Sequence, residues 1–170
     1  MRISIYLLLL AIALIPVNSC ATYKNQTKET TIFLVRHAEK ADDSKDPELS
    51  PIGSLRALSL AARLKSKKLD KVYSSDYKRT RNTAKPSADQ IKKIVDIYDP
   101  RNHTELINQL KNRSGQTFLI VGHSNSTPSL VNQILGREAY TTLDHEEYNK
   151  LFVLKCDKDW KCTDSVETYE

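Results

Sequence analysis

The sequence has 170 residues, of which 39% are hydrophobic and 28% are charged, and its formal net charge is +5. This length suits one domain with a core of its own and excludes two, and the composition is typical of a soluble globular protein. The basic residues are mostly scattered lysines, without an arginine-rich stripe interleaved with aromatic residues. We therefore expect no nucleic-acid partner.

The N-terminal segment has the pattern of an export signal. Arg2 precedes an apolar run over residues 3–17, which is too short to span a membrane comfortably but fits the core of a signal peptide. A small residue directly before Cys20 resembles a bacterial lipoprotein box, which implies a signal peptide over residues 1–19 and lipidation of Cys20. The alternatives are a plain signal peptide cleaved nearby or an uncleaved anchor.

A lipid anchor at Cys20 would place the domain next to a membrane. Residues 20–29 are mostly polar and lack periodicity, so we interpret them as a tether between a membrane and a domain over residues 30–170. We expect the protein in the bacterial cell envelope, lipid-anchored to a membrane and either periplasm-facing or surface-exposed.

The first half of the domain predicts two strands and two helices. Residues 30–35 form a continuous apolar run, typical of a strand buried on both faces, and residues 41–48 form an acidic loop. Ser50 and Pro51 are the expected N-cap and first residue of a helix. We predict for this helix an apolar face of Leu55, Leu58, Ala62 and Leu64. A second strand over residues 71–75 precedes a helix that starts near Tyr77 and that Pro86 limits or kinks.

The second half continues the alternation. A third strand is predicted within residues 91–98, followed by a turn at Asp99 and Pro100 and a helix around residues 106–110. A fourth strand over residues 118–121 leads to a helix that continues to Gly136. Residues 151–154 and 166–169 suggest a final hairpin. The pattern predicts a three-layer α/β/α sandwich with a mostly parallel central sheet and a C-terminal antiparallel hairpin.

The two remaining cysteines flank the turn of this hairpin. In an oxidising compartment Cys156 and Cys162 would form a disulfide across it, and two free thiols are the alternative. No histidine or further cysteine lies at ligand spacing, so we expect no metal there.

Two histidines follow buried strands, where α/β folds gather catalytic groups. His37 follows the first strand directly after Arg36, and His123 follows the fourth. Arg79 lies in the first turn of the second helix, where free N–H groups already favour anions. Together these side chains suit a bound phosphate and a histidine nucleophile, although each alone could be a capping, core or surface residue.

Four motifs occur in the order seen in the histidine phosphatase superfamily, the phosphoglycerate-mutase-like group. They are Arg-His-Ala-Glu at 36–39, Leu-Ser-Pro-Ile-Gly at 49–53, Ser-Ser at 74–75 with Arg79 and Thr-Ala at 83–84, and Gly-His-Ser-Asn-Ser at 122–126. The chain resembles the small, open-pocket branch of this superfamily. The resemblance implies that His37 is the phosphorylated nucleophile, that Arg36, Arg79, His123 and Ser124 bind phosphate, and that the reaction needs no metal or other cofactor. Ala38 and Ser124 replace glycines that are usual in the motifs.

Several other polar residues are candidates for further roles. Asp99 is the expected general acid, with Glu105 as its competitor. Asp43 stands where mutase-type members often carry an asparagine that contacts phosphate, and its charge argues against mutase activity. We interpret Lys78 and Arg81 as a solvated helix face, and His103 and His145 as surface residues.

The leading hypothesis is a membrane-tethered phosphatase that hydrolyses phosphomonoesters, either small molecules or phosphoproteins, through a phosphohistidine. Two alternatives remain: a phosphoglycerate-mutase-type phosphotransferase, and a non-catalytic phosphate-binding module of the envelope.

Overall fold

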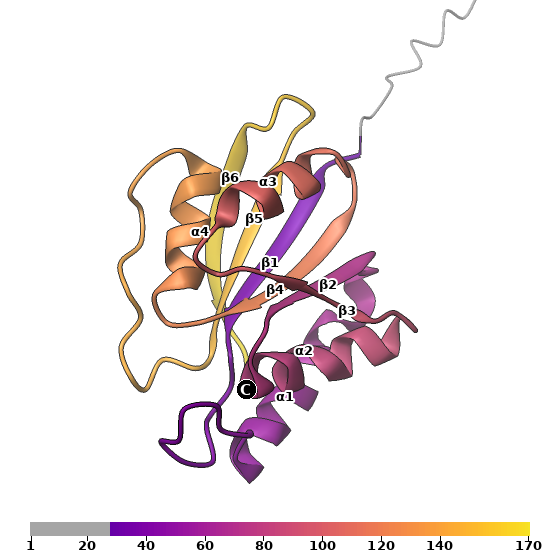
Figure 1. Ribbon diagram of the computed structural model, residues 1–170. Helices are drawn as coiled ribbons and strands as arrows, with labels where there is room; N and C mark the ends of the chain where they lie inside the picture. Colours follow the sequence, from indigo (N-terminus) through magenta and orange to yellow (C-terminus); the bar gives the residue numbers. More distant parts are fainter. Residues whose placement is uncertain (1–27) are drawn as a thin grey trace, which may run out of the picture.

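The computed structural model describes residues 28–170, which contain one six-stranded sheet (Figure 1). Its strand order is β3-β2-β4-β1-β5-β6. The strands are β1 (Thr30–Arg36), β2 (Lys71–Ser75), β3 (Val95–Tyr98), β4 (Thr117–Gly122), β5 (Lys150–Cys156) and β6 (Cys162–Thr168). The strands β1 to β4 run parallel to one another. At one side of the sheet, β5 pairs antiparallel with β1, and β6 pairs antiparallel with β5. The predicted signal peptide, Cys20 and most of the predicted tether lie outside the described residues.

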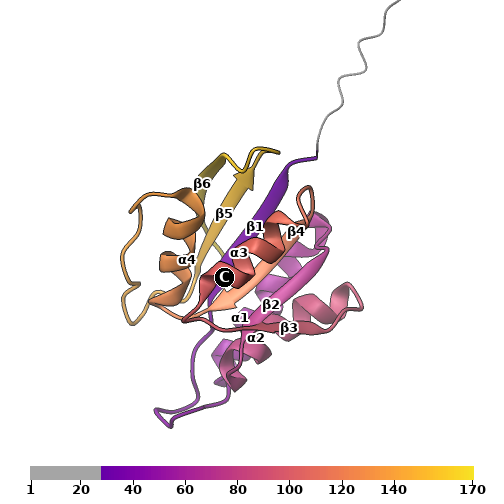
Figure 2. The same cartoon turned by 45° about the horizontal axis from the view of Figure 1, so that its top comes forward.

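Helices cover both faces of the sheet (Figures 1 and 2). The helices α1 (Pro51–Leu64) and α2 (Lys78–Gln90) pack on one face, and α3 (His103–Lys111) and α4 (Ser126–Leu135) pack on the other. In β1, Ile32 and Leu34 face α3 and α4, whereas Phe33 and Val35 face α1 and α2. This arrangement confirms the predicted three-layer sandwich. None of the helices among residues 28–170 has both the length and the apolar character needed to cross a membrane.

The predicted helix boundaries are confirmed at several ends. The Ser50 side chain accepts a hydrogen bond from the Gly53 N–H, and Pro51 is the first residue of α1. The helix α4 ends at Gly136, which adopts a left-handed conformation with a φ of 67°. Pro86 does not end α2, which continues to Gln90.

The prediction for the apolar face of α1 was wrong except at Leu64. The buried residues are Gly53, Ala57, Leu60, Ala61 and Leu64. Leu55 and Leu58 are 66% and 57% exposed, and Ala62 is also exposed. The reason is close packing: a Cβ on Gly53 would lie 2.3 Å from the Glu39 carbonyl oxygen. The first half of the helix therefore presents Gly53 and Ala57 to the domain, and Leu60 and Leu64 are buried further along the same face.

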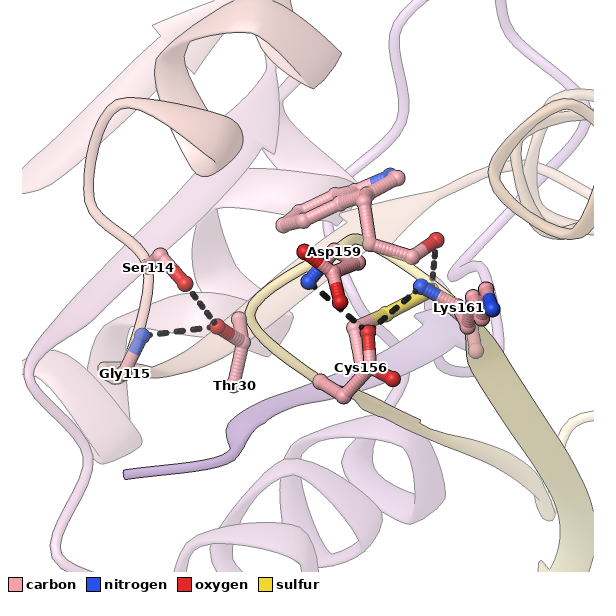
Figure 3. Close-up of a disulfide and its surroundings, with 9 residues drawn as sticks. Thr30, Ser114, Gly115, Cys156, Asp159 and Lys161 are labelled. Carbon is pink, nitrogen blue, oxygen red and sulfur yellow. Dashed lines mark hydrogen bonds between the residues drawn. A yellow bond between two sulfur atoms is a disulfide. The ribbon is translucent and has the colours of Figure 1, made fainter. Parts of the chain in front are cut away.

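The C-terminal hairpin carries the predicted disulfide between Cys156 and Cys162 (Figure 3). It joins neighbouring residues of β5 and β6 and closes a turn with a sequence separation of 6. Thr30 pairs with Cys156 in the sheet, and its side chain accepts a hydrogen bond from the Gly115 N–H at 2.7 Å. The disulfide thus braces the edge of the domain where β1 begins.

We expect the double variant Cys156→Ala/Cys162→Ala to lose roughly 2 kcal/mol of unfolding free energy. The crosslink restricts the unfolded chain by closing a short loop, and its removal restores that entropy. Urea unfolding of the oxidised wild type and the double variant measures the loss. Wild-type protein in a thiol reductant is the control and should lose a similar amount. Equal stability with and without reductant would contradict the prediction.

Candidate active site

The pairing of β1 with β4 brings the two motif histidines together. Arg36 is in register with Gly122, so His37 and His123 follow paired residues. The His37 backbone N–H extends this pairing by donating to the Gly122 carbonyl oxygen at 2.9 Å. The two imidazole centroids lie 5.6 Å apart, with ring planes at 68°. Two side chains from distant parts of the sequence therefore share one site.

The His37 ring is held in one tautomer. Its Nδ1 lies 2.8 Å from the Ala38 carbonyl oxygen, which can only accept, so Nδ1 carries the proton. The Ala38 N–H donates to the Thr83 hydroxyl at 2.9 Å, which fixes the peptide that holds the ring. The lone pair is therefore on Nε2, where it is available to attack an electrophile.

The His123 ring is oriented by hydroxyl groups from β2 and α2. Its Nε2 lies 2.9 Å from the Ser75 hydroxyl, which donates to the Thr80 hydroxyl. Thr80 in turn donates to backbone carbonyls. Because Ser75 uses its own proton on Thr80, it accepts from His123 Nε2–H. The Tyr77 ring packs edge-on against His123, with centroids 4.9 Å apart.

Two arginines complete the cluster. Arg36 donates from Nη1 to the Asp144 and His145 carbonyl oxygens, both at 2.9 Å, and its guanidinium lies 4.1 Å from the centre of the Tyr148 ring. The Arg79 guanidinium lies 4.6 Å from the centre of the Tyr77 ring. Within residues 28–170, the buried Nε atoms of both arginines have no hydrogen-bond partner. Arg79 itself is half-buried, and its Nη1 lies 3.7 Å from Asp46 Oδ1. The unpaired Nε donors of the two arginines suit an anionic ligand.

These four side chains line one cleft with a volume of about 1010 Å³. Tyr77 and Asn125, the N-caps of α2 and α4, also line it, so two helix N-termini face the same space. The positive ends of helix dipoles stabilise bound anions. The cleft therefore combines a free imidazole nitrogen with cationic and dipolar groups suited to a phosphate.

Burial and charge keep both imidazoles neutral. Burial lowers the pKa of His37 to about 3. The hydrogen bond to Ala38 opposes this shift, and the Arg36 and Arg79 charges add to it. Burial also lowers the pKa of His123 to about 4, with further lowering by the two arginines. A neutral His37 keeps its Nε2 lone pair at physiological pH.

The sequence-predicted residues divide between the cleft and its surroundings. Asp99 and Ser124 line the cleft with the four central residues. Glu105 lies on α3, where it accepts from Gln109, and is not among the lining residues. Asp43 lies outside the cleft and binds Lys40 at 2.7 Å.

Lys78 and Arg81 were predicted to form a solvated helix face, and His103 and His145 to lie on the surface; only the prediction for His103 was wrong. Lys78 and Arg81 are solvated, as expected. His145 is exposed at the cleft mouth. His103 is not a surface residue: it is buried where α3 begins, and its Nδ1 lies 3.0 Å from Gln133 Nε2 on α4. Helix packing buries a histidine whose sequence neighbours are polar.

Sequence reasoning gave no role to Ser75, Tyr77, Thr83 or Tyr148. Ser75 and Thr83 belong to a recognised motif, which was the available signal for them. Tyr148 lies in the segment before β5, and its ring packs beneath Arg36. Nothing in the local sequence pattern indicates this contact.

Comparison with known proteins agrees with the motifs. Residues 32–102 match the histidine phosphatase superfamily (branch 1), which confirms the predicted resemblance. No curated protein sequence matches the chain.

Solved structures share the fold at low sequence identity. The protein histidine phosphatase SixA complexed with tungstate is 17% identical, with a TM-score of 0.65 over 81% of this chain and 96% of that chain. Mycobacterial glucosyl-3-phosphoglycerate phosphatase is 13% identical, with a TM-score of 0.67 over 84% and 99%. A mutant of phosphoserine phosphatase from Entamoeba histolytica, in complex with phosphoserine, is 16% identical, with a TM-score of 0.61 over 82% and 96%.

We expect the buried histidines to make the fold less stable in acid. Their folded-state pKa values lie below the ordinary value of 6.5, so the unfolded chain binds protons first as the pH falls. Each histidine should remove roughly 2 kcal/mol of unfolding free energy between pH 6.5 and pH 5. Urea unfolding at both pH values should show a smaller loss for His123→Gln than for the wild type. An identical loss in the two proteins would contradict the prediction.

Proposed function

We infer that this chain is a member of the histidine phosphatase superfamily and propose that it hydrolyses phosphomonoesters through a phosphohistidine. The observation that carries this proposal is the position of His37. Its Nε2 lone pair lies in a cleft lined by two arginines whose buried Nε atoms lack partners within the described residues. The phosphatases among the structural neighbours support the same class of reaction.

In the first step, Nε2 of His37 attacks the phosphorus. The P–N bond forms as the ester P–O bond breaks. The leaving oxygen takes the bonding electrons and a proton from the carboxyl group of Asp99. Arg36 and Arg79 stabilise the negative charge on the equatorial oxygens. His123 joins them by turning its Nε2–H from the Ser75 hydroxyl to a phosphate oxygen. The Nδ1–H bond to the Ala38 carbonyl stabilises the positive charge that develops on the attacking ring.

In the second step, water attacks the phosphohistidine. A P–O bond forms as the P–N bond breaks, which releases inorganic phosphate and regenerates neutral His37. Asp99 is the carboxylate we assign to proton transfer, because it lines the cleft at the end of β3. Hydrogen bonds from the Arg101 N–H and guanidinium lower the pKa of Asp99, so its carboxyl group must take up a proton as substrate binds. It gives this proton to the leaving oxygen in the first step and regains one from the attacking water in the second.

The proposed reaction needs no metal, since the nucleophile and the groups that hold the phosphate are all side chains. We propose phosphorylated small molecules or phosphoproteins as substrates.

We expect His37→Ala to lower phosphate release by at least about a thousandfold, because the covalent intermediate cannot form. Release from a panel of phosphomonoesters is measured with a chelator present. In the wild type, rapid acid-free quenching should trap ³²P on His37 as an acid-labile adduct. The matched control is His145→Ala, whose ring lies at the cleft mouth and contacts Glu146. It should stay within about threefold of the wild type. Undiminished release by His37→Ala would remove the mechanism.

We also propose that the domain is tethered to a membrane in the bacterial cell envelope by lipid on Cys20. The apolar run over residues 3–17 and the small residue before Cys20 support this. The disulfide between Cys156 and Cys162 fits an oxidising compartment outside the cytoplasm.

Metabolic labelling with a radioactive fatty acid tests the tether. The wild type should incorporate label and sediment with membranes, whereas Cys20→Ser should incorporate none, because lipidation needs the thiol. Cys162→Ala is the control and should label like the wild type. Unlabelled wild-type protein recovered without lipid would exclude the anchor.

A further inference from the structure

The cleft is much larger than a phosphate site. Its volume of about 1010 Å³ is at the upper end of the range for drug-sized ligands, roughly 300–1,000 Å³. A phosphate among Arg36, Arg79 and His123 fills only part of this space. The alcohol part of the ester must therefore contact the remaining walls, and their chemistry bears on which alcohols fit.

Tyr77, Ile97 and Pro100 are apolar side chains among the cleft-lining residues, and we call them the apolar wall. Ile97 is 51% exposed although it belongs to a strand. The Tyr77 ring stands at 88° to the His123 ring, with centroids 4.9 Å apart, so this wall begins beside a group that holds phosphate. Exposed apolar side chains in a cleft favour a ligand that removes them from water.

The charged groups at the rim of the cleft cancel one another in pairs. Arg101 binds Asp99 at 3.2 Å, and Lys40 binds Asp43 at 2.7 Å. Asp76 also lines the cleft and pairs with Arg81. Because these cations already have carboxylate partners, they offer a second anionic group of the substrate little net attraction. The rim therefore adds no binding for phosphorylated carboxylic acids.

We propose that the wall formed by Tyr77, Ile97 and Pro100 binds an uncharged aromatic group on the alcohol side of the ester, so that the substrates are aromatic phosphomonoesters. This inference rests on the proposed phosphatase function and specifies its substrate class. The ring lies on the apolar wall while the phosphate binds Arg36 and Arg79.

Three substrates test the inference. Benzyl phosphate and ethyl phosphate have leaving alcohols of similar basicity and differ mainly in the ring, and 3-phosphoglycerate adds a carboxylate. We expect kcat/KM for benzyl phosphate to exceed that for ethyl phosphate by about tenfold or more, as for an aromatic ring that loses contact with water. We expect 3-phosphoglycerate to be the poorest of the three.

Variants at Ile97 and Ile94 test whether the preference for benzyl over ethyl phosphate depends on the apolar wall. Ile97→Ser should lower the benzyl-to-ethyl ratio by about fivefold, and Ile97→Leu should retain it. Ile94→Ser is the matched control, because Ile94 is 81% exposed and lies outside the lining residues. It should leave the ratio unchanged.

The outcomes separate this inference from the proposed function. Turnover of ethyl phosphate with a benzyl-to-ethyl ratio near one, a preference for 3-phosphoglycerate, or an unchanged ratio in Ile97→Ser would overturn the inference alone. Absence of turnover with all three esters would overturn both.

Discussion

The parallel pairing of β1 with β4 is the constraint on which the site depends. It places Arg36 opposite Gly122, so that the residues that follow them, His37 and His123, meet where both strands end. A shift of this register by one residue would turn each side chain to the opposite face of the sheet. Both strands are buried between two helical layers, and their apolar side chains specify the register on both faces at once.

The same burial sets the chemistry of the cluster. Little water solvates the imidazoles and guanidiniums, so the histidines stay neutral and the arginine Nε atoms lack partners within the described chain. Such an arrangement is unfavourable for the isolated protein and becomes favourable when a phosphate arrives. Tyr148 offsets part of this cost, because its ring faces the Arg36 guanidinium without neutralising it. The C-terminal segment contributes too, since the Tyr169 hydroxyl donates to the Tyr148 carbonyl oxygen.

The cations at the rim of the cleft differ from the two arginines beside the histidines in how they are paired. The Nε atoms of Arg36 and Arg79 lack partners among the described residues, although Arg79 Nη1 lies 3.7 Å from Asp46. Lys40 and Arg101 at the rim each bind an aspartate more closely. Under the proposed function, the arginine Nε donors would hold the phosphate, and the paired charges at the rim would add little attraction for the rest of the substrate. The apolar surface around Ile97 is then the feature that we propose to discriminate among alcohols.

The sequence by itself determined the strand and helix order, the N-cap at Ser50, the end of α4 at Gly136 and the residues of the proposed phosphate site. These follow from local patterns: buried apolar runs, capping chemistry and four short motifs in a fixed order. Tertiary structure alone decided which face of α1 is buried. Apolar residues lie on two sides of that helix, and the close approach of the Glu39 backbone requires the side that carries Gly53 to face the domain.

Local sequence patterns also could not predict the contacts between segments that are distant in the sequence. His103 is buried because α4 packs against it, and Tyr148 lies under Arg36 because the segment before β5 passes there. The pairing of rim cations with aspartates also depends on side-chain positions in space. Periodicity and capping report how a segment folds, whereas the partner of a side chain depends on which other segment packs against it.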